Sequence, residues 1–300
     1  MPAARASTRW RRRSRRTPAS TSRSASAASS SWRARRSKRR RCARWRRARP
    51  PPASRPSGSI AAALRAAEPR VTPAALGAAR FAGDATVHSG RLVAALAAAA
   101  WKRGAVLVPG GEVHAAVRAG DRVARVRITD TWVAPGTVVL AAGAWTPRIA
   151  GLAPDVGVVP VPGQMLALAM PPAALRHVVM HADGCLTPQP PDEAWCGGTV
   201  EPQGFARAVT ATGVATLLAD LARIVPEAAG WPIRRLWAGI RPCAPAGGPL
   251  VGREPSLENL IVASGHYRNG ILLAPIAAET VAALVAGTPP PPEAIPFLPA

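Results

Sequence analysis

Residues 260–275 read LIVASGHYRNGILLAP, and this stretch decides the fold. Its first five residues form an apolar run typical of a buried strand, and residues 271–286 are apolar over the length of a helix. Gly265 and Gly270 enclose the connection between them. Such a turn lets the backbone approach a flat ligand closely and points the N–H groups of the helix start toward negative charge. The alternative is an ordinary strand-to-helix connection in which Arg268 is merely solvated.

Two upstream segments favour a ligand site over an ordinary connection. RLWAGIRPCAP at 235–245 places Arg241 after an apolar strand and immediately before Pro242, where a guanidinium fork could point into a cleft. TVVLAAGAW at 137–145 is a buried strand that leads into a turn of small residues, which suits close packing against a nucleotide. Both segments are compatible with a cofactor site shared with the 260–275 stretch.

The rest of the chain beyond Ile60 mixes helices and strands without strict alternation, which predicts a mixed sheet with packed helices. Apolar residues at helical spacing, with Gly or Pro at the ends, predict helices over 60–67, 90–103 and 211–225. Alternation around Gly120 predicts a hairpin of 112–117 and 122–128. Further strands are expected at 159–170, 185–188, 194–199 and 233–240.

The charge of +23 is concentrated at the N-terminus. Residues 1–55 contain 20 of the 39 basic residues, and the first acidic residue is Glu68. The remainder carries 19 basic and 16 acidic residues, so it is an almost neutral globular sequence. Because residues 1–58 contain almost no Leu, Ile, Val or Phe, we expect a disordered tail.

Three interpretations of this tail remain open. Arginines interspersed with tryptophans could bind nucleic acid. An Arg-rich, Ser-rich segment without acidic residues also resembles an organellar transit peptide. The third interpretation is translation of GC-rich coding DNA in the wrong frame, because the chain has 37 Arg against Lys38 and Lys102 alone. Nucleic acid is not the favoured partner of the chain as a whole.

The motifs GHYRNGILLAP, WAGIRP, PVPGQMLAL and VVLAAGAW together resemble the FAD-dependent D-amino-acid oxidase family, most closely its glycine oxidase group associated with thiamine biosynthesis. The resemblance covers residues from about 60 to 288. It implies an α/β fold with an incomplete Rossmann-like FAD-binding domain (59–150 and 250–288) and an antiparallel-sheet substrate domain (151–249). A disordered tail (1–58) and an extended C-terminal tail (289–300) would flank them.

The resemblance also implies site residues. Arg241 would bind the substrate carboxylate, and Arg268 would assist from the turn beside the flavin. FAD would contact Val113 on its adenine side, and its isoalloxazine ring would contact the run His266, Tyr267, Arg268, Asn269, Gly270, Ile271 and Leu272. The implied reaction is oxidative deamination of glycine or another small amino acid, with a 2-oxo acid, ammonia and hydrogen peroxide as products.

The sequence departs from that family in two places. Cys185 stands where similar enzymes place a tyrosine over the substrate, so it is a weaker candidate for substrate binding, and a buried structural thiol is the alternative. Similar enzymes also begin with a strand, a GxGxxG turn and a helix that bind the FAD diphosphate, but this sequence contains no GxGxxG. A frame shift or wrong start would explain this difference.

The sequence leaves other activities open. A related sarcosine, proline or D-amino-acid oxidase, or a dehydrogenase with another electron acceptor, is the first alternative, and a nucleic-acid-binding protein is the second. The longest apolar runs are about half of what a bilayer requires, and no cysteine pair has the CxxC spacing of a zinc site. We therefore expect a cytoplasmic protein with an amino acid and oxygen as partners and no membrane or metal, and leave homo-oligomerisation open.

Overall fold

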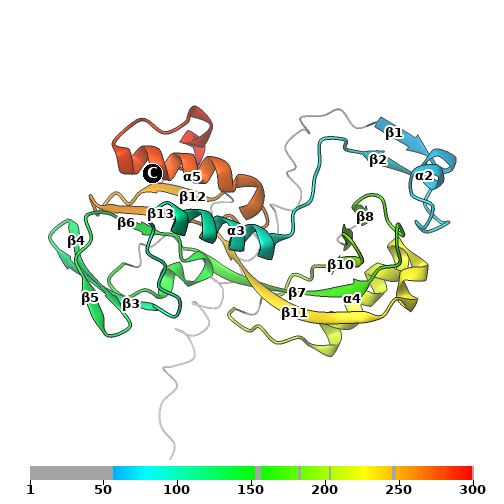
Figure 1. Ribbon diagram of the computed structural model, residues 1–300, viewed down its shortest axis with the longest axis horizontal. Coiled ribbons are helices and arrows are strands. Elements are labelled where there is room, and N and C mark those ends of the chain that lie inside the picture. The colour runs from blue at the N-terminus through cyan, green and yellow to red at the C-terminus, as the bar shows by residue number, and fades with distance from the viewer. Residues whose placement is uncertain (1–56, 153–156, 182–183, 203, 245–247, 299–300) are drawn as a thin grey trace, which may run out of the picture. The chain divides into compact units, whose positions relative to one another are not determined.

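The computed structural model describes residues 57–152, 157–181, 184–202, 204–244 and 248–298 (Figure 1). All of them lie in the second of the two units into which the chain divides, residues 39–300. The predicted basic tail, apart from its last two residues, lies outside the described residues.

An antiparallel sheet of five strands is formed by the middle of the chain, in the order β11-β7-β10-β9-β8. The strands are β7 (Val159–Ala169), β8 (Val179–His181), β9 (Gly184–Gln189), β10 (Glu193–Gly197) and β11 (Ile233–Cys243). The two long strands pair along their whole length, so that Arg241 lies opposite Val161 and Trp237 opposite Met165. This sheet confirms the expected antiparallel architecture of the region.

Helix α4 (Ala211–Ile224) covers one face of the five-stranded sheet. Thr210 begins the helix, because its side-chain oxygen accepts a hydrogen bond from the Gly213 N–H. The helix contributes Leu217, Leu221 and Ile224 to a buried cluster. The sheet contributes its own buried side chains to that cluster, among them Leu166, Leu168, Leu186, Ala194 and Cys196. Since strand side chains alternate between faces, the residues between these point away from α4.

A smaller sheet of three strands contains the decisive stretch, in the order β12-β13-β6. Its strands are β12 (Leu250–Arg253), β13 (Leu260–Ser264) and β6 (Val138–Leu140). β13 pairs with β6 in parallel and with β12 in antiparallel orientation. Helix α5 (Gly270–Ala286) follows β13 and ends at Gly287 in a left-handed conformation (φ 72°). The predicted strand–turn–helix is therefore confirmed.

The predicted hairpin is also present, as β3 (Val113–Ala119) and β4 (Arg122–Ile128), with β5 (Thr131–Val133) as a third strand. Asn259 joins this sheet to the start of β13. Its amide N–H groups donate to the carbonyl oxygens of Val123 and Gly136, and its oxygen accepts from the Val123 N–H at 2.8 Å. Leu140, Leu257 and Leu260 pack with Val123 in the core between the two sheets.

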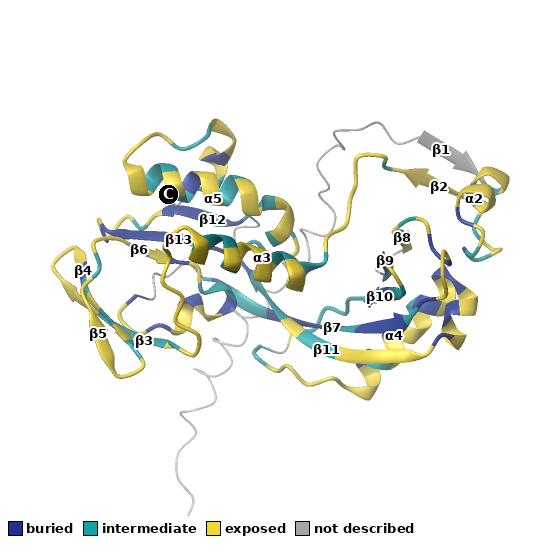
Figure 2. Cartoon of the chain, viewed as in Figure 1, coloured by how far each residue is buried: buried dark blue, intermediate teal, exposed yellow. Residues whose placement is uncertain are grey.

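The first described residues form β1 (Ser57–Ile60), α2 (Ala61–Ala67), β2 (Gly77–Arg80) and α3 (Ser89–Lys102). The helices match those predicted over 60–67 and 90–103. Figure 2 shows α3 and β5 largely exposed, whereas β7 and β13 are mostly buried. At the other end, the prediction of an extended tail over 289–300 is wrong in part, because Pro292–Phe297 form a 3-10 helix, η3, with Ala294 buried.

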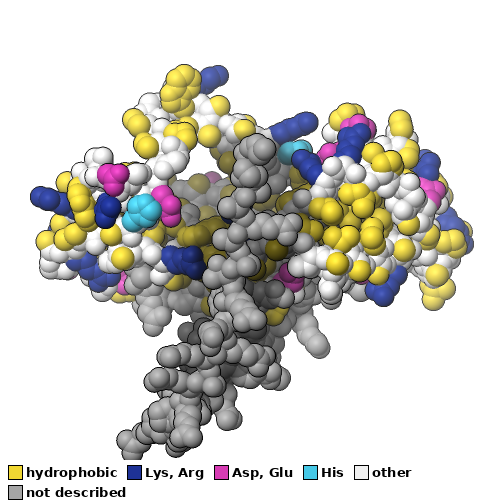
Figure 3. All heavy atoms as spheres, turned by 90° about the horizontal axis from the view of Figure 1, so that it is seen from below, with side chains coloured by type: hydrophobic (Ala, Val, Ile, Leu, Met, Phe, Trp, Pro, Cys, Tyr) yellow, Lys and Arg dark blue, Asp and Glu magenta, His cyan; other side chains and the backbone are white. Residues whose placement is uncertain are grey.

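No helix within the described ranges is long and apolar enough to cross a membrane. In Figure 3, basic side chains of the described residues are scattered among acidic and hydrophobic ones on the face shown. The concentration of positive charge found in the sequence therefore belongs to residues before the described part.

Candidate active site

Arg241 lies near the end of β11 with its guanidinium against two backbone carbonyls. Its Nη1 donates to the carbonyl oxygen of Thr199 at 3.1 Å and of Pro162 at 3.4 Å. Pro162 lies in β7, and Thr199 follows β10, so three neighbouring segments meet at this one side chain. A guanidinium carries its N–H groups in a planar fork, and this geometry matches a carboxylate.

Two glycines make room for this guanidinium. A Cβ atom on Gly163 would collide with both Nη atoms of Arg241, and a Cβ on Gly198 would lie 2.8 Å from Nη2. The backbone of Gly163 is in a conformation open to other residues, so the requirement for glycine there is steric. Glycine within a strand often marks such a close approach. A Cβ atom there would also collide with the Thr199 carbonyl oxygen, so any other residue at position 163 would disturb the guanidinium together with one of the carbonyls that it contacts.

Strand register places Cys185 on the same face of the sheet as Arg241. Leu186 of β9 points into the cluster under α4, so Cys185 on one side of it points to the opposite face. Leu166 of β7 likewise points to α4, and Val161, opposite Arg241, lies on the other face. The face away from α4 therefore carries both predicted substrate-binding side chains of the sheet.

The turn after β13 is joined directly to the end of β11. The Tyr267 N–H donates to the carbonyl oxygen of Pro242 at 2.7 Å, and His266 pairs with Cys243 in an isolated bridge. The Tyr267 side chain packs against Val161 and Cys243. Two segments that the sequence analysis assigned to one site, 241–243 and 265–270, are thus in contact.

The turn has the backbone geometry that close approach requires. Gly265 has φ 79°, and a side chain there would also collide with Ala244. Tyr267 has φ 51°, which is uncommon for a residue with a side chain. Asn269 caps α5 without a side-chain hydrogen bond, and Ile271 and Leu272 at the helix start are 49% and 78% exposed. The helix start combines backbone N–H groups with accessible apolar side chains.

The positive charge of Arg268 acts on the Cys185 thiol. Burial raises the pKa of the Cys185 thiol above its usual range, and two effects oppose this rise: a contact with the Thr187 hydroxyl at 3.3 Å and the positive charge of Arg268. Arg268 is exposed, yet close enough for its charge to act on the thiol. Cys185, Arg268 and the segment that follows Arg241 therefore lie in one region.

His266 has a pKa that is lowered from the ordinary 6.5, because burial disfavours the charged imidazole. It adjoins a small apolar cavity that is also lined by Leu273 and Ile276 of α5, Val251 of β12 and Phe297 of η3. Neither Arg241 nor Arg268 lines that cavity. The predicted contact of His266 with a flavin stays a prediction.

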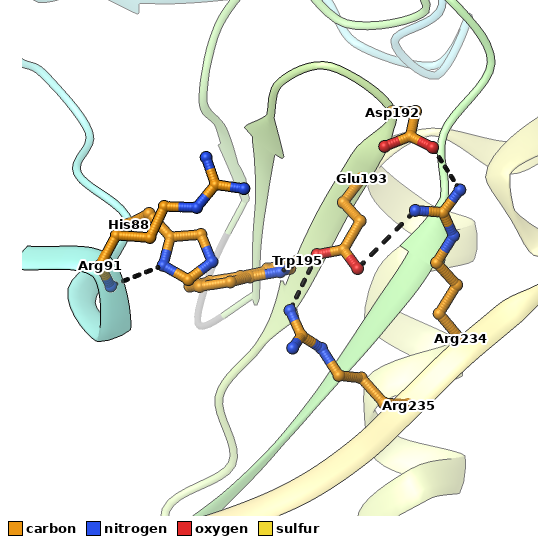
Figure 4. A network of polar contacts seen from close by, with 7 residues as sticks. All are labelled: His88, Arg91, Asp192, Glu193, Trp195, Arg234 and Arg235. Carbon is orange, nitrogen blue, oxygen red and sulfur yellow. Dashed lines mark hydrogen bonds and ion pairs between the residues drawn. The ribbon is translucent and has the colours of Figure 1, made fainter. Parts of the chain in front are cut away.

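A group of aromatic and charged side chains occupies the same sheet face farther along β10 and β11 (Figure 4). The Trp195 ring lies between His88 and Trp237, with ring-centroid distances of 4.9 and 5.6 Å. The Arg235 guanidinium lies over both tryptophans, and Glu193 accepts hydrogen bonds from Arg235 and the Trp195 indole. His88 also begins α3, since its Nδ1 accepts from the Arg91 N–H. This group joins α3 to the sheet.

The structure separates one predicted residue from the others. Val113 lies at the start of β3, partly buried against the core around Val123 and Leu260, and not in the turn after β13. Sequence reasoning, in turn, assigned no role to Gly163, Gly198 or Thr199, which contact Arg241. The signal was present in the PGQ of PVPGQMLAL, because a glycine inside an apolar strand indicates a close backbone approach.

Comparison with known proteins gives concordant results. The family described as FAD dependent oxidoreductase matches residues 3–284. Glycine oxidase of Geobacillus kaustophilus is 39% identical over 223 residues, 73% of this chain and 58% of the relative. Hydrogen cyanide synthase subunit HcnC of Pseudomonas aeruginosa is 34% identical over 238 residues, 78% of this chain and 57% of the relative.

Among solved structures, glycine oxidase from Geobacillus kaustophilus superposes with a TM-score of 0.77 at 32% identity, covering 82% of this chain and 67% of that one. The chain spans somewhat more than half the length of the two curated relatives. The family match extends over nearly the whole chain, and the fold agrees with it. The chain belongs to the FAD-dependent oxidoreductase family that includes glycine oxidase.

Proposed function

We propose that this chain belongs to an oxidase of glycine or another small amino acid. The observation that carries the proposal is the contact between the Arg241 segment and the turn at 265–270, through the hydrogen bond from Tyr267 to Pro242. Arg241 would bind the substrate carboxylate, and Arg268 would add positive charge beside it. A charge-assisted hydrogen bond of this kind contributes about 1.5–3 kcal/mol.

The residues around the turn fit the flavin end of FAD. The uncapped start of α5 offers backbone N–H groups to an electron-rich ring edge, and the exposed Ile271 and Leu272 offer apolar contact to a flat ring. FAD, when bound, would accept the hydride from the substrate α-carbon and pass the electrons to oxygen, giving hydrogen peroxide. Hydrolysis of the resulting imine would give ammonia and a 2-oxo acid.

The protein's part in this chemistry is positioning. Binding of the carboxylate by Arg241 would fix which face of the α-carbon points toward the turn. Burial disfavours a positive charge on His266 at this position. The hydride would go to the cofactor and the proton of the substrate ammonium to solvent, so the proposal assigns no side chain as a general acid or base.

The proposal is tested with the purified 300-residue chain, FAD and a peroxidase-coupled assay of hydrogen peroxide. Glycine, sarcosine, proline and D-alanine are compared. Peroxide formation from glycine that depends on added FAD is the expected result. A chain that retains no yellow flavin and forms no peroxide from any of these substrates would contradict the proposal for this chain.

A second candidate is an oxidation of similar chemistry with a different small substrate or electron acceptor. Two observations favour it: position 185 on the site face carries a thiol and not an aromatic ring, and a relative of comparable identity is named a hydrogen cyanide synthase subunit. Repeating the assay with a dye as electron acceptor separates the candidates. Turnover with the dye but not with oxygen would favour the second.

A further inference from the structure

A polar network centred on the buried Gln164 lies behind Arg241, on the face of the sheet that α4 covers. It consists of Gln164, Thr199, Glu201 and Thr210. Gln164 follows Gly163 in β7, so its side chain points to the face opposite the guanidinium. Its side chain is fully buried, and a buried amide requires hydrogen-bond partners.

Each polar atom of the Gln164 side chain has such a partner. Nε2 donates to the Glu201 carboxylate at 2.7 Å and to the Thr210 hydroxyl at 3.0 Å. Oε1 accepts from the Thr210 N–H at 2.8 Å. Gly213 of α4 leaves no room for a Cβ atom beside this amide. The Gln164 side chain is therefore fixed between the strand and the start of the helix.

The same network fixes the two carbonyls that Arg241 contacts. The Gln164 N–H donates to the Thr199 hydroxyl at 2.8 Å, and the Thr199 N–H donates to the Gln164 carbonyl at 3.1 Å. The Thr199 hydroxyl in turn donates to Glu201 at 2.5 Å. The Glu201 N–H donates to the Pro162 carbonyl at 3.0 Å. Thr199 and Pro162 supply the oxygens that accept from Arg241 Nη1.

We infer that Gln164 is a positioning residue, which orders the Thr199 and Pro162 carbonyls and through them the carboxylate-binding fork of Arg241. The inference rests on the proposed function, because it needs Arg241 to bind a carboxylate. A structural role alone would lower the stability of the sheet and leave carboxylate affinity unchanged. The two roles are therefore separable by experiment.

The test uses the full 300-residue chain and glycolate as a small carboxylate probe. The dissociation constant is measured from the rise in unfolding temperature with glycolate concentration, with sodium chloride at matched ionic strength as the reference. Gln164→Met removes both polar atoms at similar volume and is expected to weaken glycolate binding at least fivefold. Leu221→Ala destabilises the same helix–sheet layer without touching the network, and its dissociation constant should stay within twofold of wild type.

A double variant that recovers glycolate affinity would distinguish the positioning role from a general loss of stability. Gln164→Glu alone places a carboxylate beside that of Glu201, and the two repel each other. The double variant Gln164→Glu with Glu201→Gln restores the hydrogen bond between these positions, with donor and acceptor exchanged. The double variant should recover glycolate affinity to within twofold of wild type. Should Gln164→Met fail to fold, Thr199→Val removes the linking hydroxyl and is expected to weaken binding in the same direction.

The outcomes distinguish this inference from the proposed function. If Arg241→Gln abolishes glycolate binding while the Gln164 and Thr199 variants bind like wild type, the positioning role is overturned and the carboxylate site stands. If Arg241→Gln binds glycolate normally, or the wild-type chain binds none, the proposed function is overturned and the inference with it.

Discussion

The Tyr267 N–H donates a hydrogen bond to the carbonyl oxygen of Pro242, across 25 residues of sequence, at 2.7 Å. This bond joins the end of β11, in the five-stranded sheet, to the turn that precedes α5. Pro242, which follows Arg241, therefore lies beside Tyr267, which precedes Arg268. The distance from Arg241 to the turn is thus set by the backbone, independently of the long side chains.

Arg241→Lys tests the carboxylate fork. A lysine keeps the charge but offers a single ammonium in place of a planar pair of N–H groups. We expect about a 10- to 100-fold weaker affinity for glycolate or a higher KM for glycine, corresponding to the roughly 1.5–3 kcal/mol of a charge-assisted bond. The control is Arg234→Lys on the same strand, because Arg234 pairs with Asp192 and Glu193 and not with the proposed carboxylate site, and it should change neither value. Equal effects of the two substitutions would contradict the fork.

Gly163→Ala tests the steric account of the site. The added methyl group would collide with both Nη atoms of Arg241, so we expect glycolate affinity to fall about 10-fold or more. Gly239 lies opposite Gly163 in β11, and a Cβ there would meet no described atom within 4 Å. Gly239→Ala is therefore a matched control that should bind glycolate like wild type. A normal affinity in Gly163→Ala would show that the guanidinium does not depend on that space.

The elements of the fold and the contacts of the candidate site differ in how far the sequence alone predicts them. The 260–275 stretch, the hairpin and the long strands were predictable because their periodicity or apolar length is clear. Short strands such as β5, β8 and β12 span three or four residues, too few for a period to emerge. The contact of Gly163 with Arg241 depends on cross-strand register between segments 78 residues apart, which no local pattern specifies.

His266→Gln tests the buried imidazole through pH. Because the folded-state pKa is lowered below 6.5, the unfolded chain binds more protons as the pH falls through 6.5, and the folded state loses stability there. Above about pH 6.5 this loss is absent. We expect the free energy of unfolding to fall more in wild type than in His266→Gln when the pH is lowered from 7.5 to 5. Urea denaturation of both proteins at the two pH values measures this difference. A difference between the two proteins that stays the same from pH 7.5 to 5 would contradict a buried, hard-to-charge imidazole at this position.

Arg268→Ala tests the proximity of Arg268 to Cys185. The positive charge lowers the pKa of a thiol that burial has raised, so its removal should leave less thiolate and slow alkylation of Cys185 by iodoacetamide at pH 8. Peptide mass spectrometry follows each cysteine separately. Burial raises the pKa of Cys196 to about 12, so that thiol should stay almost unreactive in both proteins. The exposed Arg207→Ala is the control, and an unchanged rate at Cys185 in Arg268→Ala would contradict the proximity.

Flavin titration tests the departure from GxGxxG. The proposed flavin contacts lie in the turn before α5 and at the start of that helix, and the sequence lacks the motif that binds the diphosphate in related folds. We therefore expect the 300-residue chain to bind FAD and riboflavin with dissociation constants within about fivefold of each other, by fluorescence quenching. An FAD affinity more than 100-fold higher than that for riboflavin would show that another part of the chain binds the diphosphate.

Strand β7 divides its side chains between α4 on one side and the Arg241 region on the other. Neighbouring positions along one backbone thereby have different neighbours. On the proposed function, replacements at Val161 or Met165 would change the surface that meets the substrate, while Leu166 and Leu168 would still pack against α4. Divergence of substrate preference among descendants of such a protein can thus proceed by single steps, without passing through forms that no longer fold.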